Sequence, residues 1–120
     1  MSINFDTYTV ALLKLRSDAP HLTKEAEDAL QDAHLDHLAK LHEAGFLLAS
    51  GPVLGAPDRE LRGISILRVD PDTALRLKEQ DPAVKAGRFR VEVYPWTLPA
   101  GLIAFSPGRM PHSIAEVTGD

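Results

Sequence analysis

A histidine and an aspartate are the residues of this chain best placed to do acid/base chemistry together. His34 lies in a segment with helical spacing that ends at Gly45, and Asp81 stands directly before Pro82 in a later turn. A carboxylate that accepts a hydrogen bond from one imidazole nitrogen fixes the tautomer, so the other nitrogen can take a proton from a phenol, an enol or a carbon beside a carbonyl. The structural alternative is a satisfied core histidine and an aspartate that only caps a turn.

Other residues could bind a ligand beside this pair. The segment Ser50-Gly51-Pro52 offers a hydroxyl and an approachable backbone, although a strand end that needs glycine explains it equally well. His37 lies nearer the centre of the apolar stripe of its helix, where it either packs on the sheet or borders a pocket. Trp96 can wall a pocket, with an interface role as the alternative. The predicted substrate-binding set is therefore Ser50, Gly51, Pro52, His37 and Trp96.

The chain also contains candidate ligands for a metal or an anion. His34, His37 and His42 suggest a metal site, but their spacing lets only a subset share a helix face, and no carboxylate is placed to complete the site. We therefore predict no metal. Four arginines could share a sheet face and bind a carboxylate, with pairing to Glu92 across subunits as the alternative: Arg62, Arg68, Arg88 and Arg90.

The composition limits the classes of function. The chain has 120 residues, enough for one domain, and no cysteine, which excludes a disulfide framework, a thiolate nucleophile and a cysteine-based zinc site. With a net charge of −4, nucleic acid is not an expected partner. No segment has the pattern of a membrane span or a signal peptide, so we expect a cytoplasmic protein without a membrane partner. The glycine spacing fits no phosphate-binding loop, so we predict no cofactor.

Hydrophobic periodicity predicts the order βαββαβ. Strands are expected at residues 8–15, 46–54, 61–69 and 88–94, with a turn at 55–58 between the second and third. A helix of about twenty residues should follow an N-cap at Thr23 and stop at Gly45. A second helix should begin at Asp70 or Asp72 and break at Asp81-Pro82.

This order is typical of the ferredoxin-like α+β fold, an antiparallel sheet with both helices on one face. The first strand is apolar on both sides, so a monomer would expose an apolar sheet face, and we predict a homodimer. Residues 1–98 should form this domain. Residues 99–120 should be a partly irregular extension in which 102–105 could add an edge strand or reach a partner subunit, and the last residues should be mobile.

Five motifs in series resemble the YciI-like (YCII-related) proteins of the dimeric α+β barrel superfamily. They are His34-x-x-His37-Leu38-x-x-Leu41-x-x-x-Gly45, Ser50-Gly51-Pro52, Leu61-Arg62-Gly63-Ile64, Asp81-Pro82-x-x-x-x-Gly87 and Val91-x-Val93-x-Pro95-Trp96. The resemblance implies a homodimer whose sheets face one another. It also implies an active site at His34 and Asp81. Many relatives carry arginine where this chain has Gln31, and the one well-defined activity in the family is dehydrochlorination of a chlorinated hydroxyhydroquinone.

Two functional hypotheses from different classes follow. The first is a small cofactor-independent lyase or isomerase, dehydrochlorinase-like, that acts on a polar aromatic or enolisable compound with His34 as general base and Asp81 orienting it. The second is a noncatalytic dimeric module that binds a small molecule in the same pocket. A quinone-forming monooxygenase of the same superfamily is a third hypothesis that rests on fold alone. A partly buried His–Asp pair that opens on a pocket favours the first, and an occluded pair favours the second.

Overall fold

The computed structural model describes residues 2–55 and 59–119. Its elements are, in chain order, β1 (Phe5–Leu15), α1 (Lys24–Glu43), β2 (Leu47–Pro52), β3 (Leu61–Leu67), α2 (Pro71–Glu79), α3 (Pro82–Lys85), β4 (Phe89–Pro99) and α4 (Ile114–Thr118). The predicted βαββαβ order is confirmed, and the short helices α3 and α4 are additions that the sequence analysis missed. The predicted turn at 55–58 lies, from residue 56 onward, outside the described residues.

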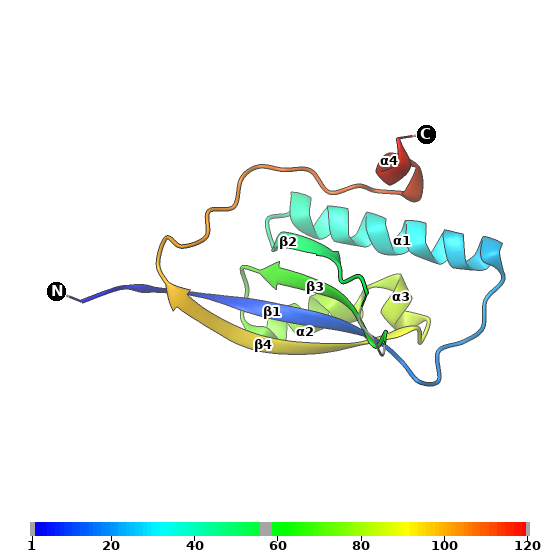
Figure 1. Ribbon diagram of the computed structural model, residues 1–120, viewed down its shortest axis with the longest axis horizontal. Helices are drawn as coiled ribbons and strands as arrows, with labels where there is room; N and C mark the ends of the chain where they lie inside the picture. The colour runs from blue at the N-terminus through cyan, green and yellow to red at the C-terminus, as the bar shows by residue number, and fades with distance from the viewer. Residues whose placement is uncertain (1, 56–58, 120) are drawn as a thin grey trace.

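The four described strands form one antiparallel sheet in the order β2-β3-β1-β4. Side chains of α1, α2 and α3 pack against one face of this sheet. The ribbons of the sheet and of these helices are drawn in Figure 1. This is the ferredoxin-like α+β arrangement. On that face α1 and α3, which are far apart in the sequence, lie next to each other.

Helix α1 is bounded by local signals that the sequence carries. The Thr23 side chain caps it by accepting a hydrogen bond from the Ala26 N–H, at 3.2 Å. Glu25 and Glu27 lie in the first turn, where the helix dipole favours negative charge. Gly45 follows the C-terminal end with a φ of +87°, a left-handed conformation that suits glycine. The helix therefore has the bounds predicted for it.

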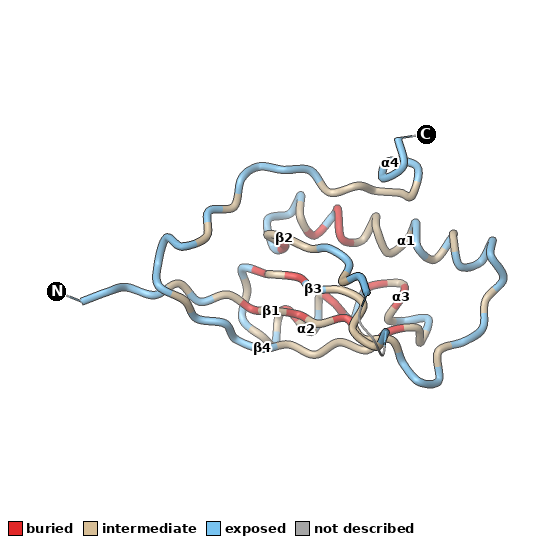
Figure 2. The backbone as a smooth tube through the Cα atoms, in the orientation of Figure 1, coloured by how far each residue is buried: buried red, intermediate tan, exposed pale blue. Residues whose placement is uncertain are grey.

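Alternation along the strands separates the core face from the opposite face of the sheet. Figure 2 shows buried residues in the middle of β1, toward the end of β3 and in the C-terminal half of α1. The main core cluster is Ala11, Leu38, Leu41, Leu47, Leu67 and Ala74. Its members come from α1, α2 and three strands, so burying them fixes both helices on the same side of the sheet.

The uncovered face of the sheet is also rich in apolar side chains. Directly paired residues of antiparallel strands point to the same side, and Leu12 pairs with Ile64 while Val10 pairs with Tyr94. Ile64 and Tyr94 are 40% and 49% exposed. The residues on this face include Tyr8, Val10, Leu12, Ile64, Ile66, Tyr94 and Trp96. The two-sided apolar character expected of β1 is therefore present.

Beyond β4 the chain turns back along the molecule toward α1 (Figure 1). Phe105 packs edge-on against Tyr8, with ring centroids 5.4 Å apart. Residues 102–105 form no strand, contrary to one expectation, because the chain leaves the sheet in a turn at Gly101, where φ is +83°. Residues 114–118 form α4, and the Ile114 N–H donates to the Asp32 carboxylate of α1 at 2.8 Å. The mobility expected of the last residues stays a prediction.

His37 links the two long helices. Its Nε2 lies 3.1 Å from the Leu77 carbonyl oxygen of α2, and its ring is partly buried. Burial lowers the pKa of His37, while the nearby Asp81 carboxylate has the opposite, smaller effect. The neutral imidazole can therefore donate its Nε2 proton to the carbonyl and still pack between the helices.

We expect His37→Ala to lower the free energy of unfolding by about 1–3 kcal/mol, because it removes both packing and a hydrogen bond between helices. Urea denaturation followed by circular dichroism measures this change. His21→Ala is the matched control: His21 is exposed, so its unfolding free energy should stay within about 0.5 kcal/mol of the wild-type value. Equal losses for the two variants would contradict the linking role of His37.

Candidate active site

His34 and Asp81 make direct contact between α1 and the start of α3. The His34 Nδ1 and Asp81 Oδ2 atoms are 2.6 Å apart, and the His34 side chain is 12% exposed while that of Asp81 is fully buried. An ionised carboxylate can only accept a hydrogen bond, so Nδ1 carries a proton, and in the neutral form of the ring Nε2 keeps its lone pair. The contact predicted from the sequence is therefore present in the structure.

Each carboxylate oxygen of Asp81 accepts a hydrogen bond. One accepts from His34, and the other, Oδ1, accepts the Ala83 N–H at 2.9 Å as the N-cap of α3. Pro82 follows at the start of the helix, where its missing N–H would have no intrahelical partner. One carboxylate therefore both caps a helix and contacts a histidine, so the capping role of Asp81 is compatible with a role in orienting His34.

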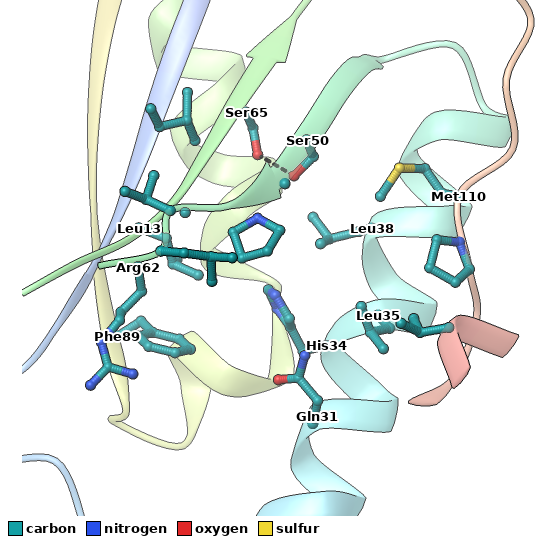
Figure 3. A pocket seen from close by; sticks show the side chains of 18 of the residues that line it. Leu13, Gln31, His34, Leu35, Leu38, Ser50, Arg62, Ser65, Phe89 and Met110 are labelled. Carbon is teal, nitrogen blue, oxygen red and sulfur yellow. Dashed lines mark hydrogen bonds between the residues drawn. The ribbon is translucent and has the colours of Figure 1, made fainter. Parts of the chain in front are cut away.

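A cavity of about 700 Å³ opens beside this pair, a volume suited to a small molecule. Figure 3 shows His34 pointing from α1 toward β2 and β3, where Ser50 and Ser65 lie. Asp81 contacts the Nδ1 atom of His34 and does not itself line the cavity. The apolar part of the wall includes Leu13, Leu35, Leu38 and Phe89. The imidazole therefore faces a ligand-sized space with apolar sides.

The structure brings only some of the predicted ligand-binding residues to this cavity. Ser50, Gly51 and Pro52 line it together with His34. His37 does not, because its ring is directed to α2. Trp96 does not either, because it lies an odd number of residues after the buried Phe89, and alternate side chains of a strand point to opposite faces. Trp96 instead pairs with Tyr8 on the uncovered face of the sheet.

Three arginines give the cavity a positively charged part. Arg59, Arg62 and Arg88 line it, two of them among the four considered from the sequence. Burial lowers the pKa of Arg62, and the neighbouring guanidinium groups of Arg59 and Arg88 add to that effect. Arg90 pairs with Glu92 within the same chain. Like charges gathered at one cavity favour an anionic ligand.

A buried lysine that was not predicted from the sequence lies in the same wall. Lys78 of α2 is 2% exposed, and its Nζ donates to Ser65 Oγ at 3.1 Å. Ser65 Oγ lies 2.9 Å from Ser50 Oγ, and all three residues line the cavity. Burial lowers the pKa of Lys78 to about 8, despite the opposing effect of the Asp81 carboxylate. The signal was available, because Lys78 follows the buried Ala74 by one helical turn and so shares its face.

The C-terminal segment forms another side of the cavity. Met110, Pro111, Ile114 and Val117 line it from that direction. His112 anchors the segment to α1 through both ring nitrogens, which lie 2.6 Å from a carboxylate oxygen of Asp36 and of Glu43 respectively. Residues that the sequence analysis assigned to an irregular extension therefore help to enclose the candidate site.

Within the described ranges, no group of three or more histidine and acidic side chains could hold a metal ion. In the same part of the chain, every helix is too short or too polar to cross a membrane.

The chain belongs to the YCII-related family, whose domain model matches residues 9–97. No match was found among the curated proteins. A solved structure, 5-chloro-2-hydroxyhydroquinone dehydrochlorinase (TftG) from Burkholderia phenoliruptrix AC1100 in complex with 2,5-dihydroxybenzoquinone, is similar to this chain with a TM-score of 0.56. The two are 24% identical, and the match covers 74% of this chain and 92% of the other. This similarity shows that the two proteins share the same fold.

The His112 contacts make the docking of the C-terminal segment dependent on pH. Hydrogen bonds to Asp36 and Glu43 raise the pKa of His112, so their stabilisation is fully present below about pH 6.5 and is lost as the pH rises through the raised value. Lys40 and His112 together lower the pKa of Asp36, which keeps that carboxylate ionised as the pH falls toward its lowered value.

We expect trypsin to cleave the bond after Arg109 more slowly in the wild type than in His112→Ala at about pH 6, and the difference between the two rates to be smaller at about pH 9. Comparing the two proteins at the same pH cancels the pH dependence of the protease itself. His21→Ala should behave like the wild type throughout. A ratio of rates that does not change with pH would contradict the proposed dependence on His112.

Proposed function

We propose that this YCII-related protein is a cofactor-independent, lyase-like enzyme that uses His34 as a general base, oriented by Asp81, on a small polar aromatic or enolisable compound. The observation that carries the proposal is the 2.6 Å contact of His34 Nδ1 with Asp81 Oδ2 beside a cavity of about 700 Å³. A pair sealed beneath the core would favour binding alone. Here His34 is partly exposed and lines the cavity, which favours catalysis.

The chemistry needs a base that can take a proton and then hold a positive charge. His34 Nε2 would accept a proton from a hydroxyl group or an acidic carbon, and the electron pair left behind would form a new double bond as the leaving group departs with its own bonding electrons. The Asp81 carboxylate would stabilise the imidazolium formed in this step. The reaction involves no net oxidation, so two side chains suffice for the proton transfer.

The walls of the cavity support the substrate class. Leu13, Leu38 and Phe89 offer apolar surface to a planar ring, and Arg59, Arg62 and Arg88 offer positive charge to an ionised substituent. Ser50, Gly51 and Pro52 would add a hydroxyl and backbone groups for orientation. A chlorinated hydroxyhydroquinone, the substrate class named for the similar solved structure, combines these features and is the first compound to test.

The test is release of chloride from 5-chloro-2-hydroxyhydroquinone, followed with a chloride electrode. We expect His34→Gln to lower kcat by about a hundredfold or more, because the base is lost. Asp81→Asn should also lower kcat strongly, because an amide can donate to Nδ1 and so favour the wrong tautomer. His21→Ala is the control and should keep wild-type turnover. Undiminished turnover by His34→Gln would overturn the base assignment, and ligand binding without any turnover would leave the noncatalytic binding module as the function.

We propose further that the protein is a homodimer whose sheets face one another. The uncovered sheet face supports this assembly, since Ile64, Tyr94 and Trp96 leave 39–49% of their surface exposed there. Exposed apolar surface gathered on one face is typical of an interface. A symmetric pairing of the two faces would bury these side chains in both subunits at once.

Light scattering coupled to size exclusion at micromolar concentration measures the assembly. We expect a dimer for the wild type and a monomer for Ile64→Asp, because the substitution places a charge in the centre of the proposed interface. Leu102→Asp is the matched control, since Leu102 is 69% exposed but lies outside the sheet, and it should remain dimeric. A monomeric wild type would refute the face-to-face assembly.

A further inference from the structure

The buried lysine of the cavity wall has few partners for its charge. Lys78 is 2% exposed, and within the described residues its Nζ donates one hydrogen bond, to Ser65, and forms no ion pair. An ammonium group has three donors, and a buried charge is costly unless it is paired. Methionine would fill the same space without that cost. The amine therefore points to a partner that enters the cavity, which Lys78 itself lines.

The hydrogen bonds of Lys78 continue to the cavity surface in a defined direction. The ammonium can only donate, so Ser65 Oγ accepts from it at 3.1 Å. Ser65 is 4% exposed, and its own proton is satisfied if it donates to Ser50 Oγ, 2.9 Å away. Ser50 then keeps its proton for a further acceptor. That acceptor would lie in the cavity, which Ser50 lines (Figure 3).

We propose that Lys78, Ser65 and Ser50 form a proton relay that binds a negatively charged ring oxygen of the ligand and donates a proton to it, on the side of the cavity toward which His34 points. The substrate class is thereby narrowed to rings with a phenolate or enolate oxygen. This inference rests on the proposed function, in the case where His34 removes a proton from a ring carbon beside a carbonyl and so leaves negative charge on the carbonyl oxygen.

The proton transfer balances within the relay. Ser50 gives its proton to the ligand oxygen, Ser65 gives its proton to Ser50, and Lys78 gives its proton to Ser65. The oxyanion becomes a hydroxyl group and the ammonium becomes an amine, with no change of oxidation state. Lys78 acts through two hydroxyls and is therefore a positioning residue, whereas Ser50 is the group that touches the ligand.

The charged groups around Lys78 come from several elements. The Asp81 carboxylate at the start of α3 favours the ammonium form. The charge of Lys78 contributes to the lowered pKa of His37 in α1. His34 of the same helix lines the cavity together with Lys78. Arg62 of β3 also lines the cavity. The pKa of Lys78 is about 8, burial keeps the pKa of the neighbouring His37 below its ordinary value, and arginine stays charged, so the loss of charge on Lys78 can be followed separately from these groups.

The experiment measures the affinity for 2,5-dihydroxybenzoquinone by calorimetric titration from about pH 7.5 to about pH 9.5. The hydroxyls of this probe are conjugated with carbonyls and fully ionised in that range, so any change of affinity comes from the protein. Hydroquinone, which lacks this ionisation at pH 7.5, is the neutral probe. The variants are Lys78→Met, Ser50→Ala and, as the matched control, the exposed Lys85→Met.

We expect the wild-type affinity for the quinone to fall at least about tenfold as the pH rises through the pKa of Lys78, in line with the loss of one charged hydrogen bond. Lys78→Met should bind at least about tenfold more weakly at pH 7.5, without that pH dependence, while its affinity for hydroquinone stays unchanged. Ser50→Ala should bind the quinone severalfold more weakly. Lys85→Met should match the wild type.

Lys78→Met removes a buried charge, so its melting temperature should equal or exceed that of the wild type. If Lys78→Met does not fold, the pH profiles of the wild type and Ser50→Ala test the relay. The relay requires the wild-type affinity for the quinone to fall as the pH rises, and it requires Ser50→Ala to bind the quinone more weakly than the wild type. Wild-type affinity without pH dependence, a folded Lys78→Met that binds like the wild type, or no quinone binding at millimolar concentration would overturn the relay.

Failure of the relay and failure of the proposed function give different results. If chloride release depends on His34 but Lys78→Met does not change the affinity for the quinone, the relay is rejected and the enzymatic function is retained. Affinity that depends on Lys78, without turnover, would keep the relay as a binding device and reject catalysis.

Discussion

The burial of one carboxylate is the constraint on which the candidate site depends. Asp81 is fully buried, and a buried charge requires hydrogen-bond partners. Its partners are the Ala83 N–H of α3 and the His34 ring of α1. The same two bonds that satisfy the charge therefore fix where α3 meets α1 and how the imidazole is turned toward the cavity. Fold and site share these contacts, so a change at Asp81 acts on both.

The features predictable from the sequence are those with a local signal. Thr23 and Gly45 mark the ends of α1 because capping depends on residues within one turn. The two faces of β1 follow from alternation alone. The contact of His34 with Asp81 was predictable because the βαββαβ order places both helices on one sheet face. The same alternation, counted from Phe89, would also have placed Trp96 on the uncovered face.

The features that the sequence analysis missed depend on contacts between distant segments. The C-terminal segment has no periodic pattern, and it is held by bonds from His112 to Asp36 and Glu43 of α1. Helix α3 has four residues, too few for a periodic signal, and it is stabilised by its cap and by packing on α1. Lys78 shares a helix face with the buried Ala74, but its hydrogen-bond partner, Ser65, lies on another element and has no local signal in the sequence.

Prolines in the two edge strands restrict how this sheet can grow. In the order β2-β3-β1-β4, β2 ends at Pro52, and β4 contains Pro95 and ends at Pro99. Proline has no N–H to offer to an incoming strand, so neither edge presents an unbroken row of donors for strand addition. Amyloid-like stacking through the edges is thereby disfavoured even though the sheet has an apolar face. The chain can thus keep an exposed apolar sheet face while its sheet edges resist the strand pairing that leads to fibrils.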